Sequence, residues 1–539
     1  MNQKKIIFNI LSFIFIAISL LLFLKIDYRL VNDLGCCSDE SDYYMHAETI
    51  VEDFDFDYSN QLYGHEEDRY YKNNKSAPIG FLGSGILFSP FLLLGNFLDY
   101  IFNLWTNEPL SSITNFKILT YSFGSVFYLF ISINLIIYSL QILNVKFSKI
   151  HIYIIFLGNG ITYYAFERYG MSHVPEVLGS SIIIFLSVKY YSANKNQNFI
   201  SIILPIFLLI SYSIKWVNYY ILILPLLIKL IFFKNKQIYK PLHKNILFIF
   251  SLIFSSSLFF ISTYFIYGKF TINPSYVYTK SDLESNVKLE SLFSITENVI
   301  ETLLSYLKNF LIILFSEEFG IFWFSPIIFF VLVFLIYEFL KNIRLRDKNF
   351  TSYLAFLVFM QVIFIHILWE SPGSSYGYRY LLNLIPLCVM LYFYKYKKNI
   401  YIHKLLITLS VFALFSTIFF ETTEMTQLST VPVINSFGIN SSFTQPLYLR
   451  GYLMSIFEIE SYLKIFTTSY LGLSVLKVLT YVFGKENLLT IFEVYNLPIG
   501  NTKFLTLLDN VELIPIFYFV VLFLFIFFVI RLSLKTLKN

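Results

Sequence analysis

The strongest constraint on this chain is a series of apolar runs, each long enough to cross a lipid bilayer as a helix. Roughly 20 apolar residues cover the hydrocarbon core, and the first run extends over residues 6–26. Further runs follow at 116–143, 150–165, 176–192, 198–214, 216–233, 246–267, 321–340, 350–368, 380–395, 404–420 and 512–531. Only 14% of the residues are charged, whereas soluble domains carry about 25%. The chain is therefore predicted to be an all-α polytopic membrane protein with about twelve transmembrane helices.

Basic residues gather on every second connection between these runs, as the positive-inside rule requires for a correct set of spans. The clusters are Lys146 and Lys149; Lys189 and Lys195; Lys234, Lys236, Lys240 and Lys244; Lys341, Arg344, Arg346 and Lys348; Lys395, Lys397, Lys398 and Lys404; and Arg531, Lys535 and Lys538. Lys4 and Lys5 place the N-terminus on the same side. Both termini are thus predicted to be cytoplasmic, in a multi-pass protein of the cytoplasmic (inner) membrane.

The apolar stretch 79–105 does not fit this alternation, because counting it as a span would move every later basic cluster outside. It contains residues that are unfavourable in a straight lipid-facing helix, namely Gly80, Gly83, Gly85, Pro90, Gly95 and Asp99. We expect helices that lie in the outer interface or re-enter the bundle. The same expectation holds for 302–315 and 464–484.

Three regions follow from this assignment. Residues 1–420 form a transmembrane module, with an acidic first outer loop at 27–78 and interfacial helices at 79–105. Residues 421–511 form an outer loop with amphipathic segments, and 512–539 hold the last transmembrane helix and a basic cytoplasmic tail.

The first outer loop contains the densest group of acids. Its pattern predicts a short helix from about Tyr43 to Val51, preceded by Asp39, Glu40 and Asp42. Acids are favoured at a helix start by the helix dipole. They serve there either as capping and solvating groups or as participants in chemistry.

Signals for metals and for common hydrolases are weak. No HExxH, P-loop or GxSxG motif occurs, so zinc proteolysis, nucleotide hydrolysis and serine hydrolysis lack support. Three aspartates alternate with aromatic residues, which predicts an exposed strand or turn; these are Asp53, Asp55 and Asp57. A calcium loop at this position is weakly supported, because the glycine and the closing glutamate that such a loop needs are missing. The three cysteines cannot build a disulfide framework, and a net charge of +5 gives no reason to expect nucleic acid.

Four stretches on the predicted outer face occur in a recognisable order. They are the acidic loop with Asp39-Glu40, Tyr43, Ala47-Glu48-Thr49-Ile50 and Glu52 to Asn60, then Ala77 to Phe91, Ser316 to Pro326, and Trp369 to Pro386. This order resembles that of bacterial type C (GT-C) glycosyltransferases, which use polyprenyl-phosphate-linked sugars. These enzymes are related in plan to protein O-mannosyltransferases and to the aminoarabinose transferase that acts on lipid A. The resemblance covers the N-terminal two-thirds of the chain or more.

The resemblance implies transfer of a hexosyl or pentosyl group, with inversion, from a polyprenyl-phosphate-linked donor to a glycolipid, polysaccharide or protein on the outer face. It assigns the general base to Asp39, with Glu40 and Asp42 as open alternatives, and leaves a divalent cation as one option. The candidate substrate contacts, which rest on the resemblance together with position and chemistry, are Glu40, Asp42, Tyr43, His46, Arg168, His173, Tyr376 and Arg379. Arg379 is the best candidate for the phosphate, since a guanidinium group binds phosphate bidentately.

Simpler interpretations stay open for several of these residues. Arg379 suits a side chain that snorkels to the interface, and Lys215 either contacts the lipid phosphate or anchors its span.

Two other classes of protein also fit the spans. A transporter or lipid flippase would place ionisable residues near mid-membrane, and a polysaccharide polymerase or ligase would use a large late loop.

Overall fold

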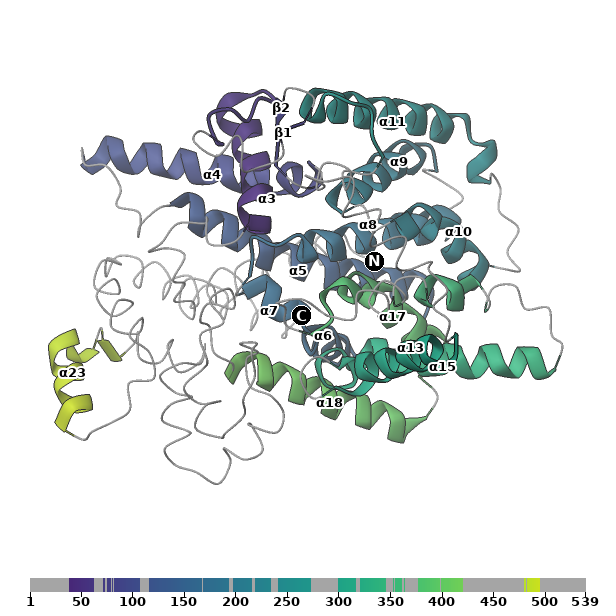
Figure 1. The fold of residues 1–539 in the computed structure, drawn as a ribbon. Coiled ribbons are helices and arrows are strands. Elements are labelled where there is room, and N and C mark those ends of the chain that lie inside the picture. Colours follow the sequence, from purple (N-terminus) through teal and green to yellow (C-terminus); the bar gives the residue numbers. More distant parts are fainter. Residues whose placement is uncertain are drawn as a thin grey trace, which may run out of the picture.

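The structure is a computed structural model. It describes residues 38–62, 71–72, 75–78, 80, 82–106, 116–166, 168–192, 197–215, 219–233, 241–272, 299–316, 320–345, 352, 354–360, 363, 377–397, 399–419, 479–480 and 482–494. Within these residues the chain is almost entirely helical (Figure 1). A single pair of two-residue antiparallel strands is present there, β1 (Tyr71–Lys72) and β2 (Lys75–Ser76), with Tyr71 opposite Ser76.

The first described helices form the acidic segment and the helix that supports it. α3 (Ser38–Glu48) continues directly into a π-helical turn, η2 (Thr49–Asp53), and α4 (Gly83–Thr106) follows the strand pair. In Figure 1 the purple α3 runs across the direction of α4 and α5 (Phe116–Ile142). α4 packs on both α3 and α5.

The remaining helices build the bundle. They are α6 (Lys149–Leu157), α7 (Ile161–Phe166), α8 (His173–Ser192), α9 (Gln197–Ile214), α10 (Tyr220–Phe232), η5 (Leu242–Lys244), α11 (Ile246–Tyr267), α13 (Val299–Phe315), α14 (Ile321–Phe324), α15 (Pro326–Arg344), η7 (Arg379–Leu384), α17 (Ile385–Leu391), η8 (Tyr392–Tyr396), α18 (Ile400–Phe419) and α23 (Lys485–Val494). α8 is buried along most of its length, between α5, α9, α10 and the η7–α17 segment. It is therefore the central helix, and its N-terminal end carries His173.

Six helices in the described part of the chain are long and apolar enough to cross a membrane. They are Gly83–Ile101, Thr120–Ile142, His173–Ser192, Gln197–Ile214, Ile246–Tyr267 and Pro326–Arg344. Shorter apolar helices cover Tyr220–Phe232, Leu304–Phe315 and Ile400–Leu414. The chain is thus an all-α protein with several helices suited to a membrane. The predicted spans 6–26 and 512–531, and most of 350–368 and 421–511, lie outside the described residues.

The predicted span 150–165 is wrong as a continuous helix. The structure divides it into α6 and α7, which have nine and six residues and meet at Gly158-Asn159-Gly160. Gly158 lies directly against the backbone of Ser410 in α18, closer than a Cβ atom would allow. The Gly160 N–H donates 2.8 Å to the carbonyl of Phe324. The chain breaks the helix here because neighbouring backbones pack into the gap.

The stretch 79–105 is one helix from Gly83 onward, not several short ones. Its glycines mark close approaches of other helices. A Cβ atom would lie 2.5 Å from Ser213 Oγ at Gly83, 2.5 Å from His46 Cβ at Gly85, and 2.5 Å from Lys117 Cα at Gly95. The glycines that argued against a lipid-facing helix therefore serve packing. The interfacial position of this helix stays a prediction.

Candidate functional site

The acidic part of the first loop lies inside α3, which begins at Ser38 rather than near Tyr43 as predicted. Asp39 therefore occupies the first turn of the helix; its side chain lies outside the described part of the structure. Glu40 and Asp42 are fully buried. Burial comes from the packing of α3 on α4 and on α5, where Tyr44 meets Tyr121 edge to face with ring centroids 5.4 Å apart. The helix starts earlier than predicted because these contacts stabilise its first turns.

Glu40 is held by an ion pair with Arg168. The Arg168 Nε donates to Glu40 Oε1 at 2.7 Å, and the two side chains are 8% and 0% exposed. Arg168 belongs to the connection between α7 and α8, which crosses over Glu40 at Gly170, where a Cβ atom would lie 3.1 Å from Glu40 Cβ. Buried charges need such a partner because desolvation alone is costly. The pair fixes the start of α3 against the start of α8.

A second polar cluster surrounds the N-terminal end of α8. Glu176 Oε1 accepts a hydrogen bond from Ser172 Oγ at 2.9 Å and lies 3.7 Å from Lys215 Nζ. His173 Nδ1 lies 3.2 Å from the same oxygen, but the imidazole lacks hydrogen-bond geometry there. Glu176 is thus a buried anchor that positions Lys215 beside His173.

Lys215 and Arg379 share one aromatic ring, that of Tyr380. Lys215 Nζ lies 4.1 Å from the ring centroid, and the Arg379 guanidinium carbon lies 5.1 Å from it. Arg379 Nη2 also donates to the Tyr380 hydroxyl at 3.2 Å. The His173 ring is 6.2 Å from the same ring. We refer to Lys215, Arg379, Tyr380 and His173 as the cationic cluster; with Glu176 as its one described carboxylate, it carries two positive charges against one negative.

Tyr43 and His46 contact the turn at Gly80. His46 Nδ1 lies 2.7 Å from the Tyr58 hydroxyl, and Nε2 lies 3.3 Å from the Gly80 carbonyl. Gly80 has φ +86°, and a Cβ atom there would lie 3.4 Å from Tyr43. Burial lowers the pKa of His46 to about 4, so the imidazole is neutral at pH 7. Both residues fix the turn before α4; their contact with substrate stays a prediction.

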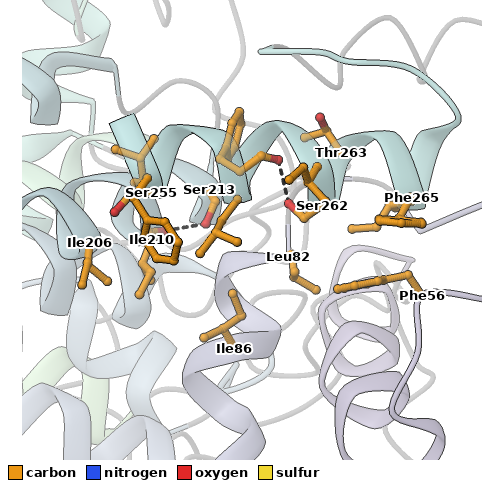
Figure 2. Close-up of a pocket in the computed structure, with 16 residues that line it drawn as sticks. Phe56, Leu82, Ile86, Ile206, Ile210, Ser213, Ser255, Ser262, Thr263 and Phe265 are labelled. Atoms are coloured by element: carbon orange, nitrogen blue, oxygen red, sulfur yellow. Dashed lines mark hydrogen bonds between the residues drawn. The ribbon is translucent and has the colours of Figure 1, made fainter. Parts of the chain in front are cut away.

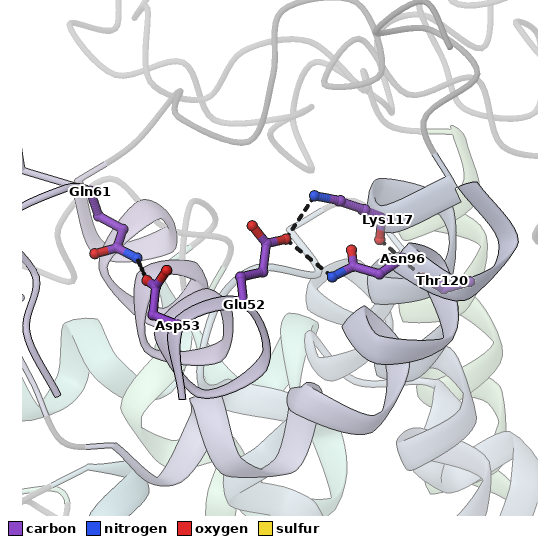
Figure 3. A network of polar contacts seen from close by, with 6 residues as sticks. All are labelled: Glu52, Asp53, Gln61, Asn96, Lys117 and Thr120. Atoms are coloured by element: carbon purple, nitrogen blue, oxygen red, sulfur yellow. Dashed lines mark hydrogen bonds and ion pairs between the residues drawn. The ribbon is translucent and has the colours of Figure 1, made fainter. Parts of the chain in front are cut away.

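A network on η2 ties the acidic segment to α4 and α5 (Figure 3). Glu52 Oε1 accepts from Lys117 Nζ at 2.7 Å and from Asn96 Nδ2 at 3.2 Å. Beside it, Asp53 Oδ2 accepts from Gln61 Nε2 at 2.5 Å. The sequence analysis gave Glu52 no role. In the structure its contacts with Lys117 and Asn96 orient η2.

The aspartates after η2 form a turn, one of the two predicted outcomes. Asp55 Oδ1 accepts from the Asp57 N–H at 3.0 Å, and Asp57 Oδ1 accepts from the Ser59 N–H at 3.1 Å. Among the described residues, no group of three or more His, Cys, Asp or Glu side chains is arranged to hold a metal ion. The metal requirement of the site is therefore left open.

The structure brings some predicted residues together. Glu40 meets Arg168, and His173 meets Arg379 around Tyr380, whereas Tyr43 and His46 both contact the turn at Gly80 and Tyr376 lies outside the described residues. Sequence reasoning missed Glu176 and Tyr380. The spacing of Ser172 and Glu176 was the available signal, because residues four apart share a helix face.

None of the protein families, curated proteins or solved structures compared with this chain matches it. The fold and site define an all-α protein with helices of membrane-crossing length, buried acids at one helix start and a cationic cluster at another.

Proposed function

We propose that this chain is a membrane glycosyltransferase of the GT-C type. It transfers a sugar, with inversion, from a polyprenyl-phosphate-linked donor to a glycolipid, polysaccharide or protein acceptor. The reaction takes place on the outer face of the cytoplasmic membrane. In this proposal the chain has about twelve spans and both termini are cytoplasmic.

The observation that carries the proposal is the cationic cluster at the N-terminal end of α8. Lys215 and Arg379 converge on Tyr380, which concentrates positive charge where a phosphate could be held. His173 follows Arg168 by five residues, so their Cα atoms are at most about 18 Å apart. Because Arg168 binds Glu40, the short connection from Arg168 to His173 joins the acidic helix start to the helix end that carries the cationic cluster.

The division of roles starts from the buried ion pair between Glu40 and Arg168. Lys215 and Arg379 would stabilise the charge that develops on the leaving lipid phosphate. Glu40 is buried and bound by Arg168, so it is poorly placed to move toward a hydroxyl or amine. Asp39, one residue earlier in the first turn of α3, is the general base in this proposal and deprotonates the acceptor.

Transfer of a radiolabelled sugar from a polyprenyl-phosphate donor, measured with purified protein in proteoliposomes, tests the base. We expect Asp39→Asn to abolish transfer while the protein keeps its thermal unfolding midpoint. Glu486→Gln is the control, because Glu486 is exposed on α23 and belongs neither to the cationic cluster nor to the acidic loop, and it should retain full activity. Full transfer by well-folded Asp39→Asn would show that the base is assigned wrongly.

The cation pair is tested in the same assay. We expect Lys215→Ala and Arg379→Ala each to slow transfer about 100-fold, the usual effect of removing one group that stabilises developing charge. Lys189→Ala, at the other end of α8, removes a lysine without touching the cluster and should leave the rate unchanged. Unchanged rates in both cluster variants would contradict a phosphate site here.

A further inference from the structure

A groove between α9 and α11 forms a cavity, with the start of α4 along one side (Figure 2). It shares no residue with the cationic cluster. Its lining is apolar over most of its length, with Ile206, Ile210, Leu258 and Phe259 among the residues. The cavity measures about 410 Å³, within the range of roughly 300 to 1,000 Å³ that small ligands occupy.

Three of the four hydroxyl groups in the groove are turned to their own helices, whereas Ser255 Oγ is buried without a hydrogen-bond partner among the described residues. Ser213 Oγ donates to the Ile210 carbonyl at 2.7 Å, Ser262 Oγ to the Phe259 carbonyl at 2.7 Å, and Thr263 Oγ1 to the Phe260 carbonyl at 2.9 Å. Figure 2 shows two of these bonds. Since three of the four hydroxyl donors are already engaged and the rest of the lining is apolar, the groove favours hydrocarbon over a polar group.

The groove ends at two aromatic rings that also line a polar pocket. Phe56 and Phe265 stack with centroids 6.3 Å apart and an interplanar angle of 16°. Both belong to the groove and to a neighbouring pocket lined by Asp55, Asp57 and Lys75. Lys75 Nζ donates to the Phe265 carbonyl at 2.5 Å, which holds the ammonium at the junction. An apolar channel therefore leads directly into a charged pocket.

The charges of this pocket indicate which lipid headgroup it can bind. One ammonium matches a phosphate, and two carboxylates match a cationic group that can donate hydrogen bonds, such as a primary amine. A lipid with a purely anionic head would meet one favourable charge and two repulsive ones. We propose that the groove and pocket together bind one chain and the head of a phospholipid that carries both a phosphate and a primary amine.

A segment of this chain is the other occupant to consider, namely the predicted first span at 6–26. A helix of 20 residues with a diameter near 10 Å fills roughly 2,400 Å³, several times the volume of the groove. The size therefore favours a single hydrocarbon chain.

Photolabelling of the purified full-length protein tests the proposal. The protein is reconstituted in phosphatidylcholine vesicles that contain a trace of phosphatidylethanolamine with a diazirine in one acyl chain, and labelled peptides are identified by mass spectrometry. Diazirine-bearing phosphatidylglycerol and phosphatidylcholine serve as comparison probes. We expect phosphatidylethanolamine to label α9 and α11 most strongly, by up to about fivefold, which is the effect of one exposed ion pair.

Two variants separate the chain site from the head site. Ser255→Trp fills the groove and should remove the label from α9, whereas Ile253→Trp, on an exposed part of α11 outside the groove, should not. Asp55→Asn combined with Asp57→Asn should keep the label but equalise phosphatidylethanolamine and phosphatidylglycerol.

Three results would overturn the proposal. One is equal labelling of α9 in Ser255→Trp and the unaltered protein. Another is equal labelling by all three lipids in the unaltered protein. The third is disulfide formation between Ser255→Cys and a cysteine placed within 6–26, since that would show the first span in the groove.

Discussion

The carboxylate of Glu40 shows how its partners decide what an acidic residue can do. It is buried and bound by Arg168, and Glu176 is similarly buried beside Lys215. A carboxylate in such a pair is fixed by charge and hydrogen bonds. It therefore positions its neighbours, and the proposed mechanism assigns the proton transfer to Asp39.

Removing one member of the Glu40–Arg168 pair should be strongly destabilising. Glu40→Gln takes the counter-charge from a buried guanidinium, and such changes cost about 3 to 5 kcal/mol. The shift in thermal unfolding midpoint of the detergent-purified protein measures this. Lys395→Gln is the comparison, because its ion pair with Glu338 at 2.6 Å is more than one-third exposed on the lysine side, so it should cost at most about 1 kcal/mol. Equal midpoint shifts would mean that burial adds nothing to the Glu40 pair.

His46 should make stability depend on pH. The pKa is about 4 in the folded protein against 6.5 for the free side chain, because the ring is fully buried. Between these values the unfolded chain binds a proton that the folded chain does not, so the free energy of unfolding falls as the pH falls from 6.5 toward 4. The loss is on the order of 3 kcal/mol.

Unfolding midpoints measured from pH 7 down to pH 5 test this. His46→Gln removes the titrating group, and its midpoint should fall less steeply with decreasing pH than that of the unaltered protein. Parallel curves for the two proteins would show that His46 does not contribute. Tyr58→Phe keeps the buried imidazole and should keep most of the pH dependence.

At the scale of elements, small residues decide how closely helices approach. Gly158 lies against the α18 backbone, while Gly170 lies against the side chain of Glu40. A backbone cannot move aside without shifting a whole helix, whereas a side chain adjusts at lower cost. The two glycines should therefore differ in their tolerance of a methyl group.

Gly158→Ala should lower the unfolding midpoint clearly, because the new Cβ atom would overlap the backbone of Ser410 and overpacking costs about 1 to 3 kcal/mol. Gly170→Ala should have a smaller effect, since its Cβ atom would lie 3.1 Å from the Glu40 side chain. The thermal unfolding midpoints of Gly158→Ala and Gly170→Ala, measured under the same conditions, test this difference. A larger loss in Gly170→Ala would contradict the role given to the α6–α18 contact.

At the scale of the whole molecule, the position of α4 tests the predicted sidedness. In a background with Cys36, Cys37 and Cys388 replaced by serine, single cysteines are placed at Phe54, Leu104 and Leu345, which are all well exposed. We expect Phe54→Cys and Leu104→Cys to react with a membrane-impermeant maleimide on intact cells. Leu345→Cys, beside the basic end of α15, should react only after permeabilisation. If Leu104→Cys also requires permeabilisation, α4 crosses the membrane and the span assignment is wrong.

Long apolar helices could be predicted from the sequence because their signal is local. The runs at 116–143, 198–214 and 246–267 correspond to α5, α9 and α11 within a few residues. The break between α6 and α7 could not be predicted, because its cause is the backbone of α18, some 250 positions later.

Some features of the candidate site could likewise be predicted from the sequence, whereas others depend on the tertiary structure. The chain alone determined that acids gather at the start of α3 and bases on alternate connections, since composition and hydropathy are properties of neighbouring residues. Only the tertiary structure decided that Arg168 binds Glu40 across 128 positions and that Lys215 and Arg379 meet on Tyr380. The physical reason is that a buried charge is tolerated only with a partner, and helix packing selects that partner from residues distant in the sequence.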